Sequence, residues 1–338
     1  MSGFVITKGS GVTESLYGNC YAPIKMFIEQ YGEACEAQSV LKNLFKMGTS
    51  QNHADLLTEL TAMDGFDPVG ENGAYPEDSF QEGNSKFLTY ETWKDSFSIS
   101  QEMIEDGKLM DLKDKPRNFI NAYNRTREKF GAALFGAAMS GAKTMTYRGK
   151  VFDTTGADKL PLFATNHKPI KKGTVQSNCF SNEFSLDAMD RAEAAMHLFK
   201  GENDEILDVE PDTIVIPEYA SLKRSVFSAI GSDQDPAAST HAFNYQYGRW
   251  NVIVWPYLNQ FIGKGKKPWI MMDSKFNEAY GGAVWNDRIK LIIKAIIDEN
   301  TDANKWKGRS RFNAGFNNWR AFCCGGMADG TDLTTLDL

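Results

Sequence analysis

The chain has 338 residues, enough for one large domain or two modest ones, and a formal net charge of -7. Apolar residues make up 42 % and charged residues 24 %, which is the ordinary balance of a soluble globular protein. The mild acidity argues against a tight DNA-binding protein, because such proteins use clustered cations to displace counterions. Neither a signal peptide nor an apolar run near the roughly 18 residues of a membrane helix is evident, so we expect a protein made in the cytosol and without a membrane segment.

The first part of the chain predicts an arm followed by a projecting loop. Residues 1–50 mix short apolar helical pieces with glycine and polar residues, which is typical of an arm that packs on something else. Residues 59–91 hold eight acidic residues against one base, Lys86, together with four glycines and two prolines. Turn formers and like charges oppose a packed core, so this segment predicts a long loop or hairpin. The alternating residues 87–99 predict a returning strand.

A long amphipathic helix is predicted at residues 116–140. Apolar residues recur at helical spacing, Pro116 suits the first turn, and Gly141 suits the end. A helix of this length spans about 37 Å at about 1.5 Å per residue. Its exposed face is predicted to be basic, although an ordinary solvated face is the competing interpretation. The bases are Arg117, Arg125, Arg127 and Lys129.

The remaining sequence alternates helices and strands. One amphipathic helix is predicted at 186–200, with Ser185 as its cap, and another begins at Pro217. Strands are predicted at 213–216, 251–255, 269–272 and 289–297, with a last strand pair between 310 and 323. This order predicts an α+β fold whose two ends return to the same core.

No arrangement of residues points to a metal site or a disulfide framework. The histidines His53, His167, His197 and His241 lack metal-ligand spacing, and the adjacent Cys323 and Cys324 suit the two faces of a packed strand. Five irregularly spaced cysteines indicate reduced thiols. The run that starts at Asp298 is similar to a calcium loop, but Ala303 replaces the required glycine and Arg309 the required acid.

No motif predicts catalysis either. Residues 263–267 lack the glycine spacing of a phosphate loop and predict a basic loop tip. No G-x-S-x-G nucleophile elbow is present in the sequence. We therefore expect a protein that is not an enzyme and that has no cofactor.

One known family fits the order of the segments. Residues 97–106, FSISQEMIED, and the long helix after them resemble the strand and spine helix of tailed-phage major capsid proteins. Residues 162–167, LFATNH, resemble a stretch of the Mu-like major head subunits. Residues 207–217 and 268–273 resemble strands of the family's axial domain, and residues 309–320 resemble its returning strand. The resemblance covers roughly residues 85–325 and rests on the order and spacing of the pieces.

The resemblance implies the capsid fold first seen in the phage Hong Kong 97 shell. That fold has an N-terminal arm, an extended E-loop, a peripheral domain with the spine helix, and an axial domain. The implied division is an arm with the start of the peripheral domain at 1–58, the E-loop at 59–98, the peripheral domain at 99–205, the axial domain at 206–305, and the return strand with the C-terminal tail at 306–338.

The implied function is a major capsid protein that forms hexamers and pentamers of an icosahedral shell around double-stranded DNA. The implied partners are other copies of the chain, a portal protein, a decoration protein, and DNA enclosed without sequence-specific binding. Only about 60 residues precede the E-loop, which favours a separate scaffolding protein over a fused scaffolding segment. The shell would assemble in the host cytoplasm and become part of the virion.

We expect contacts between subunits to join acids of the loop to bases of a neighbouring spine helix or arm. The candidates are Asp64, Asp67, Glu71, Glu77, Asp78, Glu82, Arg117, Arg125, Arg127 and Lys129. Some relatives crosslink a lysine to an asparagine, but Lys86 shows no pattern for this, and we expect it to be solvated. An encapsulin-type compartment shell, a soluble enzyme without a recognisable motif, and a phage tail-tube or adaptor protein are the alternatives.

Overall fold

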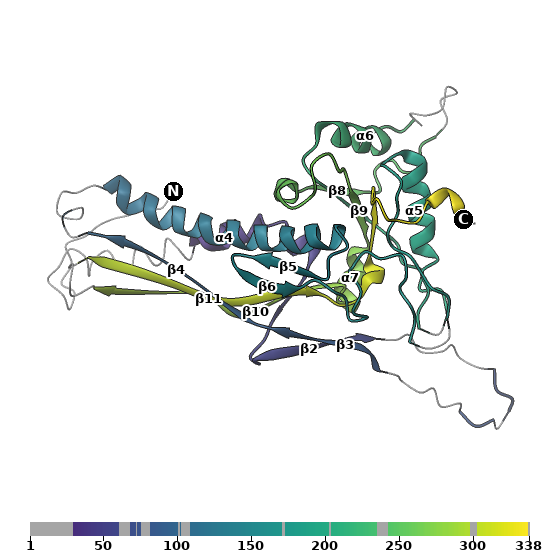
Figure 1. Ribbon diagram of the computed structural model, residues 1–338, viewed down its shortest axis with the longest axis horizontal. Helices are drawn as coiled ribbons and strands as arrows, with labels where there is room; N and C mark the ends of the chain where they lie inside the picture. Colours follow the sequence, from purple (N-terminus) through teal and green to yellow (C-terminus); the bar gives the residue numbers. More distant parts are fainter. Residues whose placement is uncertain are drawn as a thin grey trace.

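The computed structural model describes residues 30–60, 68–71, 73–75, 82–100, 102, 109–170, 173–202, 204–234, 243–297 and 303–336. A long sheet with one long helix along it extends from a second, shorter sheet that is flanked by helices (Figure 1). Among the described residues, no helix combines the length and the apolar character that a membrane span needs.

The long sheet joins strands from three distant parts of the chain. Two long antiparallel strands form its centre, a third pairs antiparallel at one edge, and a short strand pairs in parallel at the other. In spatial order the strands are β1 (Lys46–Thr49), β10 (Ala283–Ile297), β11 (Asn304–Phe316) and β4 (Glu91–Ile99). Along β11 the even-numbered side chains up to residue 312 are buried, so one face of the sheet is covered.

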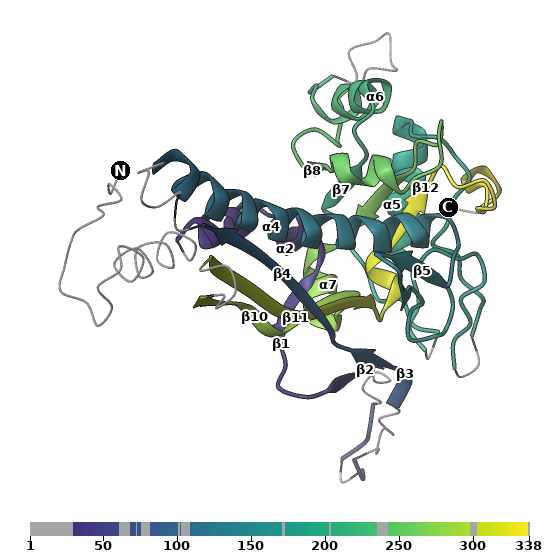
Figure 2. The same cartoon turned by 60° about the vertical axis from the view of Figure 1, so that its left-hand side comes forward.

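Helix α4 (Leu109–Met139) covers that face and runs along the long strands in both views (Figures 1 and 2). Phe119 and Ile120 pack against Ile99, Ile293 and Trp306 of the sheet. A side chain at Gly308 would collide with the ring of Phe119, so glycine permits this close approach. The helix therefore approaches the sheet closely at Phe119 and Ile120.

The predicted long helix is confirmed, but it begins at Leu109 and not at Pro116. Proline lacks the backbone N–H that a helix interior uses, so the sequence favoured a start there. In the structure Pro116 is buried inside the helix, and the neighbouring Lys115 donates to the carbonyl of Ser98. Packing on the sheet thus outweighs the local preference of proline.

The shorter sheet lies at the C-terminal end of α4. Three of its strands are buried at every position, so both faces are covered. In spatial order the strands are β12 (Phe322–Gly325), β9 (Trp269–Met272), β7 (Thr213–Ile216) and β8 (Asn251–Val254). The flanking helices and 3-10 turns are α5 (Leu186–His197), α6 (Ala220–Ile230), η1 (Pro256–Gln260), α7 (Ser274–Tyr280) and η3 (Leu333–Thr335). The predicted cap Ser185 is confirmed, since its side chain accepts from the N–H of Ala188.

The predicted last strand pair between 310 and 323 is wrong. Strand β11 belongs to the long sheet and β12 to the shorter one, because the 3-10 turn η2 (Trp319–Ala321) redirects the chain between them. Strand β10, which falls in the segment expected to be axial, pairs with β11 in the long sheet. The proposed domain boundaries stay a prediction.

Two hairpins complete the described fold. Strands β5 (Thr144–Tyr147) and β6 (Lys150–Asp153) pack beside α4. Strands β2 (Ala54–Leu60) and β3 (Glu82–Thr89) pair antiparallel and project away from the sheets, which confirms a hairpin in the acidic segment. The returning strand predicted at 87–99 divides at Tyr90 into β3 and β4. The short helix α2 (Leu41–Leu44) precedes β1.

Aromatic side chains hold α4 to the sheet at Phe130. This ring is fully buried and lies 5.5 to 6.0 Å from the rings of Trp93, Trp285 and Phe312. The variant Phe130→Ala should lower the free energy of unfolding by about 3–5 kcal/mol, because it removes these contacts and leaves a cavity. Urea unfolding of the unassembled protein measures the loss. Phe243 is 78 % exposed, so Phe243→Ala should change stability by less than about 0.5 kcal/mol.

Candidate assembly surfaces

The acidic hairpin β2–β3 is held by buried polar contacts at its root. Lys86 of β3 is only 9 % exposed, pairs with Asp153 at 3.1 Å and donates to the carbonyl of Thr155 at 2.6 Å. Burial lowers the pKa of Lys86, and the nearby Asp153 opposes the shift. The expectation of a solvated Lys86 is therefore wrong, because this lysine ties the hairpin to the loop after β6.

A second anchor is a buried guanidinium between two carboxylates. Arg320 of η2 pairs with Glu59 of β2 and, at 2.8 Å, with Glu202. All three side chains are less than 5 % exposed. The Arg320 guanidinium also lies over the ring of Trp319 at 4.7 Å and donates to the carbonyl of Lys200. Glu59, which the sequence placed in the projecting loop, is instead part of the core.

The ionised form of Glu59 is disfavoured in this environment. Burial raises its pKa, Arg320 opposes that shift, and the neighbouring carboxylates Glu202 and Asp158 add to it. Two acids share one guanidinium, so a single positive charge would have to balance two carboxylates if both were ionised. Removing the charges of Arg320 and Glu59 from water costs free energy, which their mutual attraction offsets only in part. The role of this pair is therefore to fix the position of the hairpin root and not to add stability.

His167 extends this cluster. Its ring stacks on Trp319 at 4.2 Å, and the Nδ1 atom lies 2.5 Å from a carboxylate oxygen of Asp158. The side-chain N–H groups of Asn178 donate to backbone carbonyls, so its oxygen faces Nε2 of His167 at 3.1 Å. Both ring nitrogens therefore face side-chain oxygens, which fixes the orientation of the ring. The histidine has a structural role at the corner between the sheets.

The hairpin also binds the long sheet through amide side chains. Asn313 donates to the carbonyl of Thr89 at 2.7 Å, and Asn317 donates to that of Thr58 at 3.2 Å. Asn286 donates to both the hydroxyl of Tyr90 and the carboxylate of Asp55. Each strand of the hairpin is thus tied to the body of the protein, and the hairpin leaves it in a fixed direction.

The predicted basic face of α4 is only partly present. Arg127 is 5 % exposed, bonds to Asp287 at 2.9 Å and to Glu36 at 3.3 Å, and lies over the ring of Trp285. The prediction that Arg127 lies on the exposed face is wrong, because these partners bury it inside its own subunit. Arg117 and Arg125 are exposed, and Lys129 is half-buried.

The predicted acids fall mostly beyond the described part of the hairpin. Glu71 is exposed, and Glu82 is the first residue of β3. Asp64, Asp67, Glu77 and Asp78 lie outside the described residues.

A cationic surface that the sequence analysis missed lies on the long sheet. Cross-strand neighbours share a face, and the pair Trp306 and Phe97 faces α4, so the alternate positions of β4, β10 and β11 face away from it. We call this surface the basic sheet face. Its bases are Lys94, Lys294, Lys305, Lys307, Arg309 and Arg311. The signal for it was present, since bases recur at every second position from 305 to 311.

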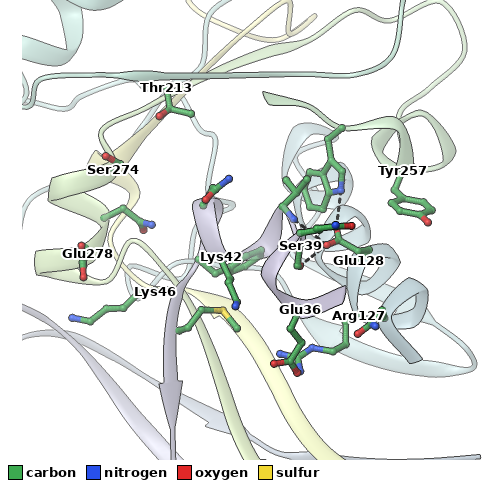
Figure 3. Close-up of a pocket in the computed structure, with 18 of the residues that line it drawn as sticks. Glu36, Ser39, Lys42, Lys46, Arg127, Glu128, Thr213, Tyr257, Ser274 and Glu278 are labelled. Atoms are coloured by element: carbon green, nitrogen blue, oxygen red, sulfur yellow. Dashed lines mark hydrogen bonds and ion pairs between the residues drawn. The ribbon is translucent and has the colours of Figure 1, made fainter. Parts of the chain in front are cut away.

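A groove of about 1510 Å³ lies where the residues before β1, helix α4 and the shorter sheet meet (Figure 3). Glu128 of α4 accepts hydrogen bonds from Ser39, from the N–H of Val40 at 3.1 Å, and from the indole of Trp255 at 3.0 Å. One carboxylate thus joins three segments. Acids and bases both line the groove, and its polar contacts hold these parts of the chain together.

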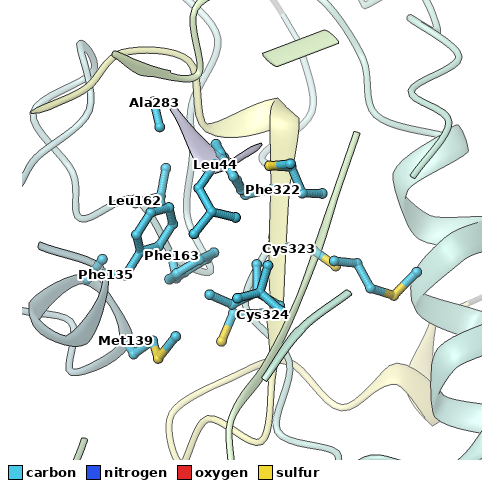
Figure 4. Close-up of a cluster of buried hydrophobic side chains, with 14 of the residues drawn as sticks. Leu44, Phe135, Met139, Leu162, Phe163, Ala283, Phe322, Cys323 and Cys324 are labelled. Atoms are coloured by element: carbon cyan, nitrogen blue, oxygen red, sulfur yellow. The ribbon is translucent and has the colours of Figure 1, made fainter. Parts of the chain in front are cut away.

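The described residues contain no group of three His, Cys, Asp or Glu side chains that could hold a metal ion. Residues 298–302 of the calcium-like stretch lie outside the described part of the chain. Cys323 and Cys324 are free and fully buried in β12, within the core that joins the two sheets (Figure 4). Burial raises the pKa of Cys323 to about 12, so its thiol stays protonated. The predicted packing role of this cysteine pair is confirmed.

The buried cluster predicts an unusual dependence of stability on pH. Because the pKa of Glu59 is raised above its ordinary value of 4.5, the folded protein binds this proton more tightly than the unfolded chain. The free energy of unfolding therefore falls as the pH rises from about 4.5 through the raised pKa of Glu59 in the folded protein. Glu59→Gln keeps an oxygen for Arg320 and removes the disfavoured charge. It should be more stable than the parent at about pH 8 and equal to it below about pH 4.5, in urea unfolding followed by tryptophan fluorescence.

Arg320→Met is the companion variant. It leaves Glu59 and Glu202 buried without their cation, so the loss should be about 3–5 kcal/mol at neutral pH. A Glu59→Gln protein that is less stable than the parent at about pH 8 would contradict the sign of the effect.

Comparisons with known proteins agree with this fold. A family model of phage capsid proteins matches residues 85–324. No curated protein sequence matches the chain. The capsid protein of cyanophage P-SCSP1u is similar in structure with a TM-score of 0.51 and 10 % identity, over 85 % of this chain and 87 % of that one. The capsid of Ralstonia phage GP4 is similar with a TM-score of 0.49 and 13 % identity, over 83 % of this chain and 86 % of that one. A virus-like particle from Pyrococcus furiosus is similar with a TM-score of 0.45 and 11 % identity, over 88 % of this chain and 98 % of that one.

The prediction of an α+β capsid fold is confirmed, while the closer resemblance to Mu-like head subunits stays a prediction. The family model covers most of the described structure, from within β3 to within β12. The chain belongs to the phage capsid protein family.

Proposed function

We propose that this chain is the major subunit of a phage head, and that its copies form hexamers and pentamers that close into an icosahedral shell around double-stranded DNA. The observation that carries the proposal is the match of the capsid family model over residues 85–324. The role is structural, and we propose no catalytic activity for it.

The hairpin supports a role in assembly. Leu56 and Phe87 are cross-strand neighbours, and they are 54 % and 71 % exposed. Exposed apolar surface costs about 25 cal/mol per Å², so a pair held outward on a rigid hairpin favours a partner that covers it. A neighbouring subunit is the partner that a shell provides at every position.

The other proposed partners follow from the family. They are a separate scaffolding protein, a portal protein and a decoration protein, together with DNA enclosed without sequence-specific contacts. The net charge of -7 fits a container that does not grip DNA tightly. Assembly would occur in the host cytoplasm, and the product would be part of the virion.

Charged contacts between subunits are also part of the proposal. The acids of the hairpin would meet cations of a neighbour, and the exposed Arg117 and Arg125 of α4 stay candidates. A single exposed ion pair contributes only about 0–1 kcal/mol, but a shell repeats the same contact at every subunit.

Electron microscopy of the purified protein, produced alone and with the scaffolding protein of the same genome, tests the function. Shells, tubes, or rings of five and six subunits are the expected result, with a matching high-mass peak in size-exclusion chromatography. A protein that stays monomeric under both conditions would contradict the proposal. Particles that enclose a protein cargo and no DNA would identify an encapsulin-type shell instead.

Charge reversal in the hairpin gives a sharper prediction. The triple variant Glu71→Lys, Glu77→Lys and Asp78→Lys should assemble less than the parent at low salt, because attraction between subunits becomes repulsion. Added salt should reduce the difference, since about 0.1 M salt screens exposed charges beyond about 10 Å. Light scattering during assembly measures both effects. The charge-preserving triple variant Glu71→Asp, Glu77→Asp and Asp78→Glu is the control and should assemble like the parent.

A further inference from the structure

The groove where α2, α4 and α7 meet is larger than a small-molecule site needs (Figure 3). Its volume of about 1510 Å³ exceeds the roughly 300–1,000 Å³ of a pocket that encloses a small ligand. Side chains of β10 and of the shorter sheet complete its walls. The space therefore suits a segment of polypeptide better than a small organic ligand.

The exposed bases of this groove lack carboxylate partners. In the parts of the chain that the structure describes, five of the lysine and arginine side chains that line it form no ion pair, and we call them the groove bases. They come from α2, β1, α4, α7 and β10, so positive charge is spread over the walls of the groove. The groove bases are Lys42, Lys46, Arg125, Lys275 and Lys290, and all five are exposed.

The acids of the groove are mostly engaged within the subunit. Arg127 pairs with two of them, as described above, and Glu128 accepts three hydrogen bonds. Asp212 accepts from the backbone N–H and the hydroxyl of Ser274. Of the carboxylates that line the described groove, Glu278 alone has no hydrogen bond or ion pair. Five cations thus face one available carboxylate, and an occupant of the groove must bring negative charge.

The walls also carry amide and apolar side chains. Met47 is 39 % exposed and Pro256 is exposed, so both offer apolar contacts. Amide groups donate and accept hydrogen bonds, as a peptide backbone does, whereas a phosphate backbone only accepts and would also meet the carboxylate of Glu278. The walls therefore favour an acidic peptide over a nucleic acid. The amides are Gln38, Asn43, Asn121, Asn124 and Asn251.

Neither end of the chain supplies such a peptide. Residues 1–29 hold two acids and two bases, so their charge does not complement the groove. The acidic residues 329–337 follow β12, and their described part is held to the shorter sheet, since Asn182 donates to Asp332 at 3.0 Å and Leu333 is fully buried. The acidic peptide must therefore come from another protein.

We infer that this groove binds an acidic segment of the separate scaffolding protein. The inference rests on the proposed function and gives that partner a surface and a chemistry, with carboxylates for the groove bases and apolar side chains for Met47 and Pro256. An occupant of the groove contacts elements of both sheets at once, so it holds them in one arrangement while subunits join. Contacts between exposed charges are weakened by salt, which keeps such binding reversible.

Crosslinking without a spacer tests which molecule supplies the acids. The chain is produced together with the scaffolding protein of the same genome, and the complex is treated with a carbodiimide, which joins a lysine amine to a touching carboxylate as an amide with loss of water. Mass spectrometry of the digest should find Lys42, Lys275 or Lys290 joined to Asp or Glu of the scaffolding protein. Crosslinks of these lysines only to acids of a second copy of the chain would overturn the inference.

Charge reversal measures the contribution of the groove bases to binding. Fluorescence anisotropy of labelled scaffolding protein is followed at low salt, with the subunit kept below the concentration at which it assembles. The variant Lys42→Glu with Lys275→Glu should raise the dissociation constant about tenfold or more, and Lys42→Gln with Lys275→Gln about threefold. About 0.5 M salt should reduce both differences.

The matched control makes the same change of charge outside the groove. Lys264→Glu with Lys267→Glu alters the exposed loop between η1 and β9, which does not line the groove, and should change the dissociation constant by less than about twofold. Urea unfolding of each variant checks that the fold is kept. A control that weakens binding as much as the groove reversal would show that only overall charge matters and would overturn the inference.

Three further outcomes would also overturn it. One is a parent protein that does not bind the scaffolding protein, and another is a groove reversal that reduces assembly equally when no scaffolding protein is present, which would make the groove a contact between copies. The third is weaker binding of labelled double-stranded DNA with unchanged binding of the scaffolding protein. If the parent forms no shell under any condition, the proposed function fails, and this result is distinct from the two-protein binding measurement.

Discussion

The buried guanidinium of Arg320 is the contact on which the arrangement of the described parts depends. It holds Glu59 at the root of the hairpin, Glu202 in the loop after α5, and the ring of Trp319 at the corner between the two sheets. No apolar contact would fix the direction of the hairpin as strictly, because a charge buried without its partner is strongly unfavourable. The direction of the hairpin is thus set by electrostatics in the core, and the surface that it presents to a neighbour follows from that direction.

The features that depend on local sequence could be predicted. Acidic residues and turn formers marked the hairpin, and helical periodicity marked α4. The burial of charged residues could not be predicted, because it depends on partners far away in the chain. Arg127 meets Asp287 at a separation of 160 residues, and Glu59 meets Arg320 at 261 residues. From the sequence alone, each of these side chains is indistinguishable from a surface charge.

The basic sheet face shows a different kind of limit. The alternating bases from Lys305 to Arg311 are visible in the sequence and predict a strand with one polar face. Their meaning depends on the neighbouring strands, which come from residues 91–99 and 283–297 and place bases but no acids on the same face. Only the register of the sheet shows that the row is a continuous surface, and only the position of α4 shows which face of the sheet the helix leaves free.

The separation of the acidic hairpin from the basic sheet face makes each subunit directional. Two copies related by a twofold axis would meet through identical patches, whereas a contact between the hairpin of one copy and a different surface of the next would join unlike patches, head to tail. Such a heterologous contact repeats around a rotation axis until the ring closes, and the angle between the two patches sets how many copies the ring holds. Because Lys86 and Glu59 hold the root of the hairpin, the angle between the hairpin and the long sheet is set by buried contacts inside the subunit and not by the neighbour.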